Sequence, residues 1–192
     1  MLALLAAGQS RRFGDRDKLS ARLGGKMLGL HAAETGTRLP LAQKLVIGSP
    51  DHDCAPQWFA LGYRIIANED AASGQGTSVR LAAAQAIRSG ARALCIILAD
   101  MPFITGDHLG RLIATFEQSN GTRIIASARS GQAMPPAIFP ADALEQLVAL
   151  DGDSGARRLL ANAELVGADD PILLDIDTET DLADANILLN NK

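Results

Sequence analysis

Short apolar runs alternate with longer amphipathic stretches along most of this chain. The clearest apolar run, residues 93–99, shows no polar alternation, which is typical of a parallel strand covered on both faces. Helical periodicity precedes it from Thr77 to about Gly90 and follows it over residues 105–119. This order of strand and helix predicts a mixed α/β fold.

Weaker patterns predict the remaining elements. The opening run forms a strand that ends at Ala7-Gly8, and a long polar loop leads from there to Lys18. A second polar loop, residues 68–76, precedes the helix at Thr77. Further strands are predicted at 45–48, 63–66, 123–128, 137–139 and 172–176, and further helices at 27–38, 141–150, 155–162 and from Thr178 onward.

Composition narrows the class of protein. A chain of 192 residues with 47% hydrophobic residues is expected to form one domain, residues 1–192. No apolar run reaches the roughly 18 residues that cross a bilayer, so we expect a cytoplasmic protein without a membrane partner. The net charge of −4 argues against a nucleic-acid partner. The two cysteines, Cys54 and Cys95, indicate neither a disulfide framework nor a zinc site.

The first polar loop carries small residues and basic groups, Leu5-Ala6-Ala7-Gly8-Gln9-Ser10-Arg11-Arg12-Phe13-Gly14, with Lys18 beyond. Small residues let backbone N–H groups approach a phosphate, and Arg12 and Lys18 can neutralise its charge. The loop lacks the Lys-Ser or Lys-Thr pair of a Walker A motif. The pattern therefore favours phosphate binding over the alternative of a solvated basic loop.

A carboxylate follows the most buried predicted strand. Asp100 stands at its end, before Met101-Pro102, where open α/β sheets place their ligands. A carboxylate there beside a triphosphate is a natural Mg²⁺ ligand, although it could instead cap the next loop. Asp175 and Asp177, at the end of the last predicted strand, could add a second ligand or serve as turn and N-cap residues.

Four segments in this order resemble the molybdopterin nucleotidyltransferases, and most closely their molybdenum cofactor cytidylyltransferase branch: the first loop with Lys18, Leu98-Ala99-Asp100-Met101-Pro102, Gly152-Asp153-Ser154-Gly155-Ala156-Arg157, and Asp175-Ile176-Asp177-Thr178 leading into Asp181-Leu182. The resemblance spans nearly the whole chain. It implies a three-layer, Rossmann-like nucleotidyltransferase fold with a mostly parallel central sheet flanked by helices, and transfer of a nucleoside monophosphate with release of pyrophosphate.

The same resemblance assigns roles to residues. It implies that Arg12, Lys18 and Asp100 are catalytic and that Asp100 binds Mg²⁺, and we expect Asp177 as the second ligand, with Asp175 as the alternative. It places the nucleotide against Leu5, Ala6, Ala7, Gly8, Ser10, Arg11, Arg12 and Lys18, and against the second glycine-rich turn at Gly74, Gly76 and Ser78.

The substrates follow from the resemblance too. Relatives that use CTP carry Ala-Ala-Gly as this chain does, whereas those that use GTP have a glycine at the position of Ala7, so CTP is expected as donor and a molybdopterin-type phosphate as acceptor. Met134-Pro135-Pro136 stands where the cytidylyltransferases usually have a Gly-His-Pro stretch. The resemblance therefore does not define the residues of the acceptor pocket. The alternatives are a guanylyltransferase, a sugar- or alditol-phosphate nucleotidyltransferase, or a carrier that delivers molybdenum cofactor to an apo-molybdoenzyme partner.

Several other residues are interpreted as structural. His31 and His52 lack the spacing of metal ligands, and Trp58 and Phe59 are interpreted as packing residues. His108 could contact substrate, and Arg157 could either form a structural ion pair or bind the acceptor phosphate.

Overall fold

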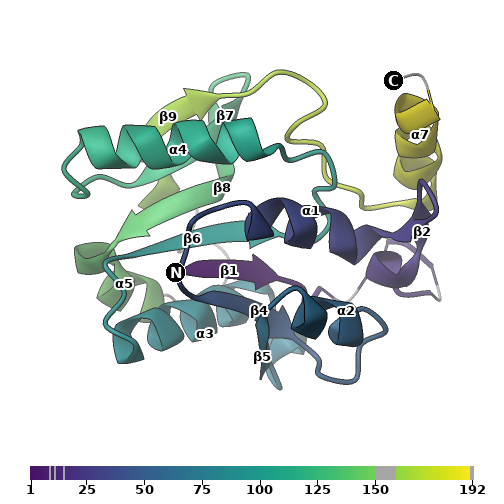
Figure 1. The fold of residues 1–192 in the computed structure, drawn as a ribbon, viewed down its shortest axis with the longest axis horizontal. Coiled ribbons are helices and arrows are strands. Elements are labelled where there is room, and N and C mark those ends of the chain that lie inside the picture. Colours follow the sequence, from purple (N-terminus) through teal and green to yellow (C-terminus); the bar gives the residue numbers. More distant parts are fainter. Residues whose placement is uncertain (9, 11, 15, 150–158, 191–192) are drawn as a thin grey trace.

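The computed structural model describes residues 1–8, 10, 12–14, 16–149 and 159–190. Its centre is a seven-stranded sheet in the order β5-β4-β1-β6-β8-β7-β9 (Figure 1). Strand β8 runs antiparallel to both of its neighbours, and the other paired strands are parallel. The strands are β1 (Leu2–Leu5), β4 (Lys44–Gly48), β5 (Arg64–Ala67), β6 (Ala93–Leu98), β7 (Ile125–Arg129), β8 (Gln132–Pro140) and β9 (Glu164–Gly167).

Helices cover both faces of this sheet, as Figure 1 shows: α1 and α4 lie on one side, α3 and α5 on the other. A small hairpin, β2 (Arg22–Leu23) and β3 (Lys26–Met27), contacts the C-terminal helix α7. The helices are α1 (Leu28–Thr37), α2 (Ala55–Ala60), α3 (Gln75–Arg88), α4 (Gly106–Gln118), α5 (Ala141–Val148) and α7 (Glu179–Asn190), with 3₁₀ turns at Lys18–Ser20 and Ala71–Ser73.

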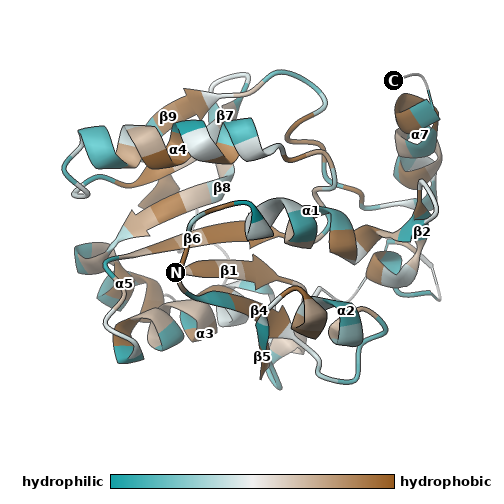
Figure 2. Ribbon diagram, viewed as in Figure 1, coloured by the Kyte–Doolittle hydropathy of each residue, from teal (hydrophilic) through white to brown (hydrophobic). Residues whose placement is uncertain are grey.

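Alternate residues of each central strand enter two separate hydrophobic layers. In β1, Leu2 and Leu4 pack on the side of α1 and α4, and Ala3 and Leu5 pack on the side of α3 and α5. Because both faces are covered, β1 and β6 are apolar throughout, as the brown strands of Figure 2 show. The predicted three-layer fold with a mostly parallel sheet is confirmed.

Most predicted elements lie close to their expected bounds, and two were incompletely predicted. Helix α3 begins at Gln75, two residues before Thr77, because Gly74 with a φ of 109° ends the preceding loop. Strand β8 spans Gln132–Pro140 and not only residues 137–139. A register shift between Ala126 and Ser127 of β7 accommodates the prolines in β8.

The strand predicted at residues 172–176 is wrong. This segment forms a turn followed by irregular chain, and Ile176 N donates one hydrogen bond to Asp100 O, 2.9 Å away. Its apolar residues, Leu173 and Ile176, are buried in the hydrophobic layer on the α1 side, so packing explains the pattern that indicated a strand. The helix predicted at 155–162 lies largely outside the described residues.

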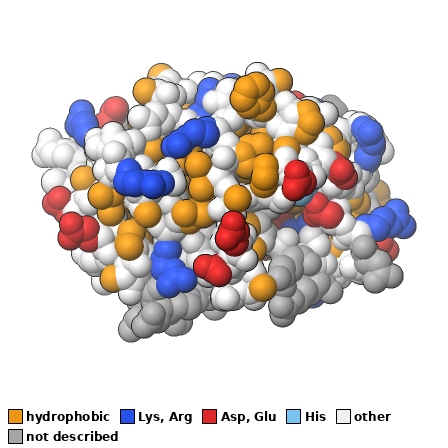
Figure 3. All heavy atoms as spheres, turned by 90° about the horizontal axis from the view of Figure 1, so that it is seen from below, with side chains coloured by type: hydrophobic (Ala, Val, Ile, Leu, Met, Phe, Trp, Pro, Cys, Tyr) orange, Lys and Arg blue, Asp and Glu red, His pale blue; other side chains and the backbone are white. Residues whose placement is uncertain are grey.

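The sequence patterns did not predict the shortest elements. Helix α2, strand β9 and the β2–β3 hairpin were not predicted. Trp58 of α2 is fully buried, as expected of a packing residue, but its neighbour Phe59 is 76% exposed. Figure 3, the view from below, shows apolar side chains on this face together with scattered basic and acidic ones. Over the described residues, none of the helices has the length and apolar character that a membrane span requires.

Candidate functional site

A cavity of about 380 Å³ opens at the carboxyl ends of β1 and β6. These strands are parallel neighbours with Leu5 opposite Leu98, so the loops that follow them lie side by side. The cavity is lined by Leu5, Ala7, Gly8, Ser10, Arg12, Lys18, Ala71, Ala72, Gly74, Gln75, Ser78, Leu98, Asp100 and Asp177. Its volume falls within the range of small-molecule sites, which is about 300 to 1,000 Å³.

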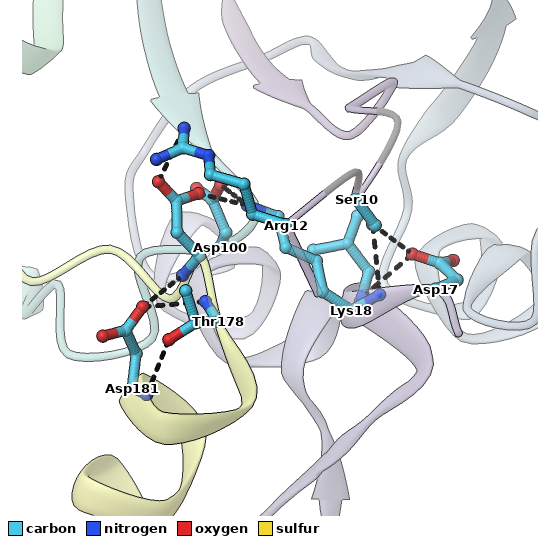
Figure 4. A network of polar contacts seen from close by, with 9 residues as sticks. Ser10, Arg12, Asp17, Lys18, Asp100, Thr178 and Asp181 are labelled. Carbon is cyan, nitrogen blue, oxygen red and sulfur yellow. Dashed lines mark hydrogen bonds and ion pairs between the residues drawn. The ribbon is translucent and has the colours of Figure 1, made fainter. Parts of the chain in front are cut away.

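Lys18 is the centre of the polar network in this cavity (Figure 4). Its Nζ lies 2.6 Å from Asp100 Oδ2 and 2.9 Å from Asp177 Oδ1. Arg12 Nη2 lies 3.0 Å from the other oxygen of Asp177. The structure thus brings together the predicted phosphate-binding cations and the predicted metal-binding carboxylates.

Two carboxylates share one ammonium group, and this arrangement shifts the pKa values of Lys18 and Asp100. Burial works to lower the pKa of Lys18, but the charges of Asp100 and Asp177 outweigh it and raise this pKa above its ordinary value. Burial raises the pKa of Asp100, against the charge of Lys18, and the nearby Asp175 and Asp177 raise it further. With Arg12, which pairs with Asp177, the network holds two cations and two carboxylates.

Arg12 differs from Lys18 in how firmly it is held. The Arg12 side chain is 76% exposed, whereas that of Lys18 is only 9% exposed. An exposed ion pair contributes little, typically about 0 to 1 kcal/mol, so Arg12 can leave Asp177 for a bound anion at little cost. Lys18 is fixed at the base of the site and Arg12 lies at its rim.

The carboxylates fit a divalent cation. Asp100 Oδ1 is buried and has no hydrogen-bond partner among the described residues, which leaves a carboxylate oxygen free to bind a metal. Asp177 faces the same network, whereas Asp175 is exposed and does not line the cavity. Within the described part of the chain, no group of three or more His, Cys, Asp and Glu side chains could hold a metal. A Mg²⁺ ion here would need phosphate and water oxygens as further ligands, which is its usual coordination.

The start of α7 fixes Asp177. Asp181 Oδ2 accepts hydrogen bonds from the backbone N–H groups of Asp177 (3.0 Å) and Thr178 (2.8 Å). Thr178 Oγ1 in turn accepts from Asp181 N at 3.1 Å, so the two side chains form a capping box. Asp177 is therefore positioned by a helix N-terminus and not by the predicted strand.

The second wall of the cavity is the loop before α3 and the first turn of that helix. Asn68 Nδ2 donates to Thr77 Oγ1 (3.0 Å) and Ser78 Oγ (2.8 Å), and Thr77 Oγ1 donates to Gly74 O (2.8 Å). These bonds hold the N-terminus of α3 against the cavity, where the positive end of the helix dipole favours negative charge.

Most of the predicted nucleotide-binding residues line this one cavity. Two do not: Ala6 and Gly76 are buried behind its wall. Arg11 and the segment from Gly152 to Arg157 lie outside the described residues. Sequence reasoning missed four lining residues, Ala71, Ala72, Gln75 and Leu98. Ala71 and Ala72 precede the predicted glycine-rich turn, Gln75 lies within it, and Leu98 stands two residues before Asp100, so proximity along the chain was the signal that could have found them.

His108 does not line this cavity. It is 1% exposed, and its Nε2 lies 2.8 Å from Ser127 Oγ, which donates to Pro136 O at 2.8 Å. Burial, with a smaller effect of Arg111, lowers the pKa of His108 to about 4. His108 is thus a neutral packing residue that holds β7 and β8 together at the register shift.

Comparisons with known proteins agree with this geometry. The family model of the MobA-like NTP transferase domain matches residues 2–168. The chain is 34% identical to the purine catabolism protein PucB of Bacillus subtilis, over 91% of this chain and 89% of that protein. It is also 34% identical to a molybdenum cofactor guanylyltransferase of Cereibacter sphaeroides, over 97% and 95%.

A solved structure supports the fold. Rv0371c of Mycobacterium tuberculosis H37Rv superposes with a TM-score of 0.78 at 22% identity, over 97% of this chain and 96% of that one. A second structure of Rv0371c, with a TM-score of 0.73 at 18% identity, is a complex with manganese.

Proposed function

Because the chain belongs to the MobA-like NTP transferase family, and is thus a nucleotidyltransferase, we propose that it transfers CMP from CTP to a molybdopterin-type phosphate acceptor and releases pyrophosphate. The observation that carries this proposal is the network of Arg12, Lys18, Asp100 and Asp177 on one side of a cavity whose other side is a helix N-terminus. We also propose that residues 1–192 act as one nucleotidyltransferase domain.

In the proposed reaction, an oxygen of the acceptor phosphate attacks the α-phosphorus of the nucleotide and pyrophosphate leaves from the opposite side. The nucleophile is already an anion, so no general base is required. The residues must hold two repelling anions in line and stabilise the charge of the transition state. Lys18, at the base of the cavity, can contact the phosphates, and Arg12, at the rim, can leave Asp177 for the triphosphate.

We propose that Asp100 and Asp177 hold Mg²⁺. The buried, unpartnered Asp100 Oδ1 supports this assignment, as does the position of Asp177 on the same Lys18 ammonium group. When bound, the ion supplies charge neutralisation to the phosphates. Asp181 and Thr178 keep the backbone of Asp177 in place for it. That the homologous fold of Rv0371c binds manganese is consistent with a divalent ion in this site.

The choice of CTP rests on Ala7, which lines the cavity where the family's GTP-dependent members have glycine. GTP is the second candidate, because three relatives at 33% or 34% identity are named molybdenum cofactor guanylyltransferases. Both candidates use the same network for the phosphates, so they differ only in the contacts of the base.

The test is pyrophosphate release by the purified protein with Mg²⁺, a molybdopterin acceptor, and CTP or GTP supplied separately. We expect release with CTP. Release with GTP alone would support the proposed type of reaction but would show that GTP, and not CTP, is the donor. If the molybdopterin acceptor gives no pyrophosphate with either nucleotide, but a sugar or alditol phosphate does, then the proposed acceptor is wrong. If the protein forms a stable complex with an apo-molybdoenzyme and releases no pyrophosphate under any condition, then it is a carrier of molybdenum cofactor and not an enzyme.

A further inference from the structure

The Asp17 carboxylate lies at the centre of a second polar cluster, next to Lys18 in the chain. Its Oδ1 accepts hydrogen bonds from Leu19 N at 3.0 Å and from Ser10 Oγ at 3.2 Å. Its Oδ2 accepts from Ser20 Oγ at 3.4 Å and is in contact with His52 Nε2. Burial works to raise the pKa of Asp17, but His52, Leu19 N and Ser10 outweigh it and lower this pKa. Asp17 is therefore an anion that caps the 3₁₀ turn Lys18–Ser20.

This cluster holds the backbone of Lys18. Ser10 Oγ, which donates to Asp17, accepts a hydrogen bond from Lys18 N at 3.1 Å. The Lys18 backbone is thus bound to the Ser10–Asp17 pair while its side chain reaches Asp100 and Asp177 (Figure 4). Any movement of Asp17 is passed to the turn that carries the Lys18 ammonium group.

His52 is anchored to the core on its far side. Its Nδ1 accepts a hydrogen bond from Cys54 N at 2.9 Å, which leaves the proton on Nε2, the nitrogen in contact with Asp17 Oδ2. The ring stacks on Trp58 with centroids 4.9 Å apart, and Trp58 Nε1 donates to Gly29 O at 2.9 Å. Trp58 is fully buried and the His52 side chain is only 11% exposed. His52 is the more buried partner of this contact, and the Asp17 side chain is 38% exposed.

The order of the groups excludes nucleophilic catalysis by Ser10. In a nucleophilic triad the histidine contacts the serine, whereas here Asp17 lies between Ser10 and His52. His52 Nε2 is in contact with Asp17 Oδ2, although it makes no hydrogen bond of regular geometry. What the cluster can do is restrain Asp17, and through it the Lys18 turn.

We propose that His52 is a positioning residue of the active site, which fixes the Lys18 ammonium group between Asp100 and Asp177 by holding Asp17 in place. Only its effect on turnover rests on the proposed function. The geometric part concerns the Lys18 amine alone and can be measured without substrate.

The test compares His52→Leu with His52→Gln, whose amide N–H can still reach Asp17, and with His31→Leu as a control for loss of a histidine elsewhere. His31 Nε2 lies 3.1 Å from Leu23 O, outside the Asp17 cluster. The first readout is acetylation of the Lys18 amine by acetic anhydride in the full chain, followed by peptide mass spectrometry. The second is kcat and KM for pyrophosphate release, with the thermal midpoint measured for each variant.

We expect faster acetylation of Lys18 in His52→Leu, near wild-type acetylation in His52→Gln and His31→Leu, and a kcat lower by about tenfold in His52→Leu alone, the size typical for partners that orient a functional group. Unchanged Lys18 acetylation in His52→Leu would overturn the proposal. Should His52→Leu not fold, Asp17→Asn replaces it with the same expectation and the same contrary outcome. If no pyrophosphate is released by wild-type protein, the proposed function fails, and the acetylation result still decides the role of His52.

Discussion

Lys18 Nζ lies 2.6 Å from Asp100 Oδ2, although 82 positions separate the two residues in the chain. The contact exists because β1 and β6 are parallel neighbours and each is followed by a functional segment at its carboxyl end. The Lys18 side chain is 9% exposed and that of Asp100 is 19% exposed, so the pair is largely shielded from water. A shielded charge beside a phosphate is the kind of contact that stabilises a transition state strongly.

The first prediction follows from this pair. We expect Lys18→Met and Asp100→Asn each to reduce pyrophosphate release by about 10²- to 10³-fold, because each removes one electrostatic contact with the reacting phosphates or their metal. The measurement is steady-state turnover, with circular dichroism to verify the fold. Lys44→Met, at the start of β4, is the matched lysine control and should retain activity. Near wild-type turnover in either site variant would refute the assignment.

The second prediction separates the two carboxylates that the sequence left as alternatives. Asp177 binds Lys18 and Arg12 in the cavity, whereas Asp175 is exposed. We expect Asp177→Asn to raise the Mg²⁺ concentration for half-maximal activity at least about tenfold, and Asp175→Asn to leave it unchanged. A chelator should abolish turnover in the wild type, and added Mg²⁺ should restore it. If only Asp175→Asn raises this Mg²⁺ concentration, then Asp175 and not Asp177 is the second metal ligand.

Sequence analysis predicted the central strands of the sheet and most of the residues that line the cavity, and burial of those strands is the physical reason. Strands covered on both faces are apolar throughout, so β1 and β6 stand out, and the polar residues directly after them mark the site. By contrast, β9 is largely exposed and has no apolar signal. Leu173 and Ile176 are buried although their segment is irregular, so the apolar pattern of residues 172–176 wrongly indicated a strand.

The Asp17 cluster could not be predicted from the sequence. His52 follows β4 and lies 35 positions from Asp17, without any spacing that links them. Its partner in stacking, Trp58, belongs to α2, a helix of six residues that is too short to give a periodic pattern. Only the packing of α2 against α1 and β5 brings this histidine to the first loop.

The third prediction concerns pH and His108, whose pKa falls from 6.5 to about 4 on folding. Between these values the unfolded chain binds more protons, so the free energy of unfolding must decrease as the pH falls from about 6.5 to about 4. At about 1.4 kcal/mol for each pKa unit, His108 accounts for up to about 3 kcal/mol of this loss.

The variant His108→Gln tests this. Its amide N–H can still donate to Ser127 Oγ, but it does not titrate. Urea unfolding at about pH 7 and about pH 4.5 should show a smaller loss of stability in the variant than in the wild type. An equal loss in both proteins would mean that other groups cause the acid sensitivity.

The last prediction concerns the base of the nucleotide. Ala7 lines the cavity, and the resemblance to the cytidylyltransferases makes its methyl group the proposed determinant of the base. One methyl group in a binding site changes discrimination between substrates by about 10- to 200-fold. We expect Ala7→Gly to raise the ratio of kcat/KM for GTP to that for CTP by about tenfold. Ala72→Gly removes a methyl group from the opposite wall of the same cavity and should change both donors alike. If Ala7→Gly leaves the ratio unchanged, or if the wild type already prefers GTP, then the contacts at Ala71, Ala72 and Gln75 select the base and Ala7 does not.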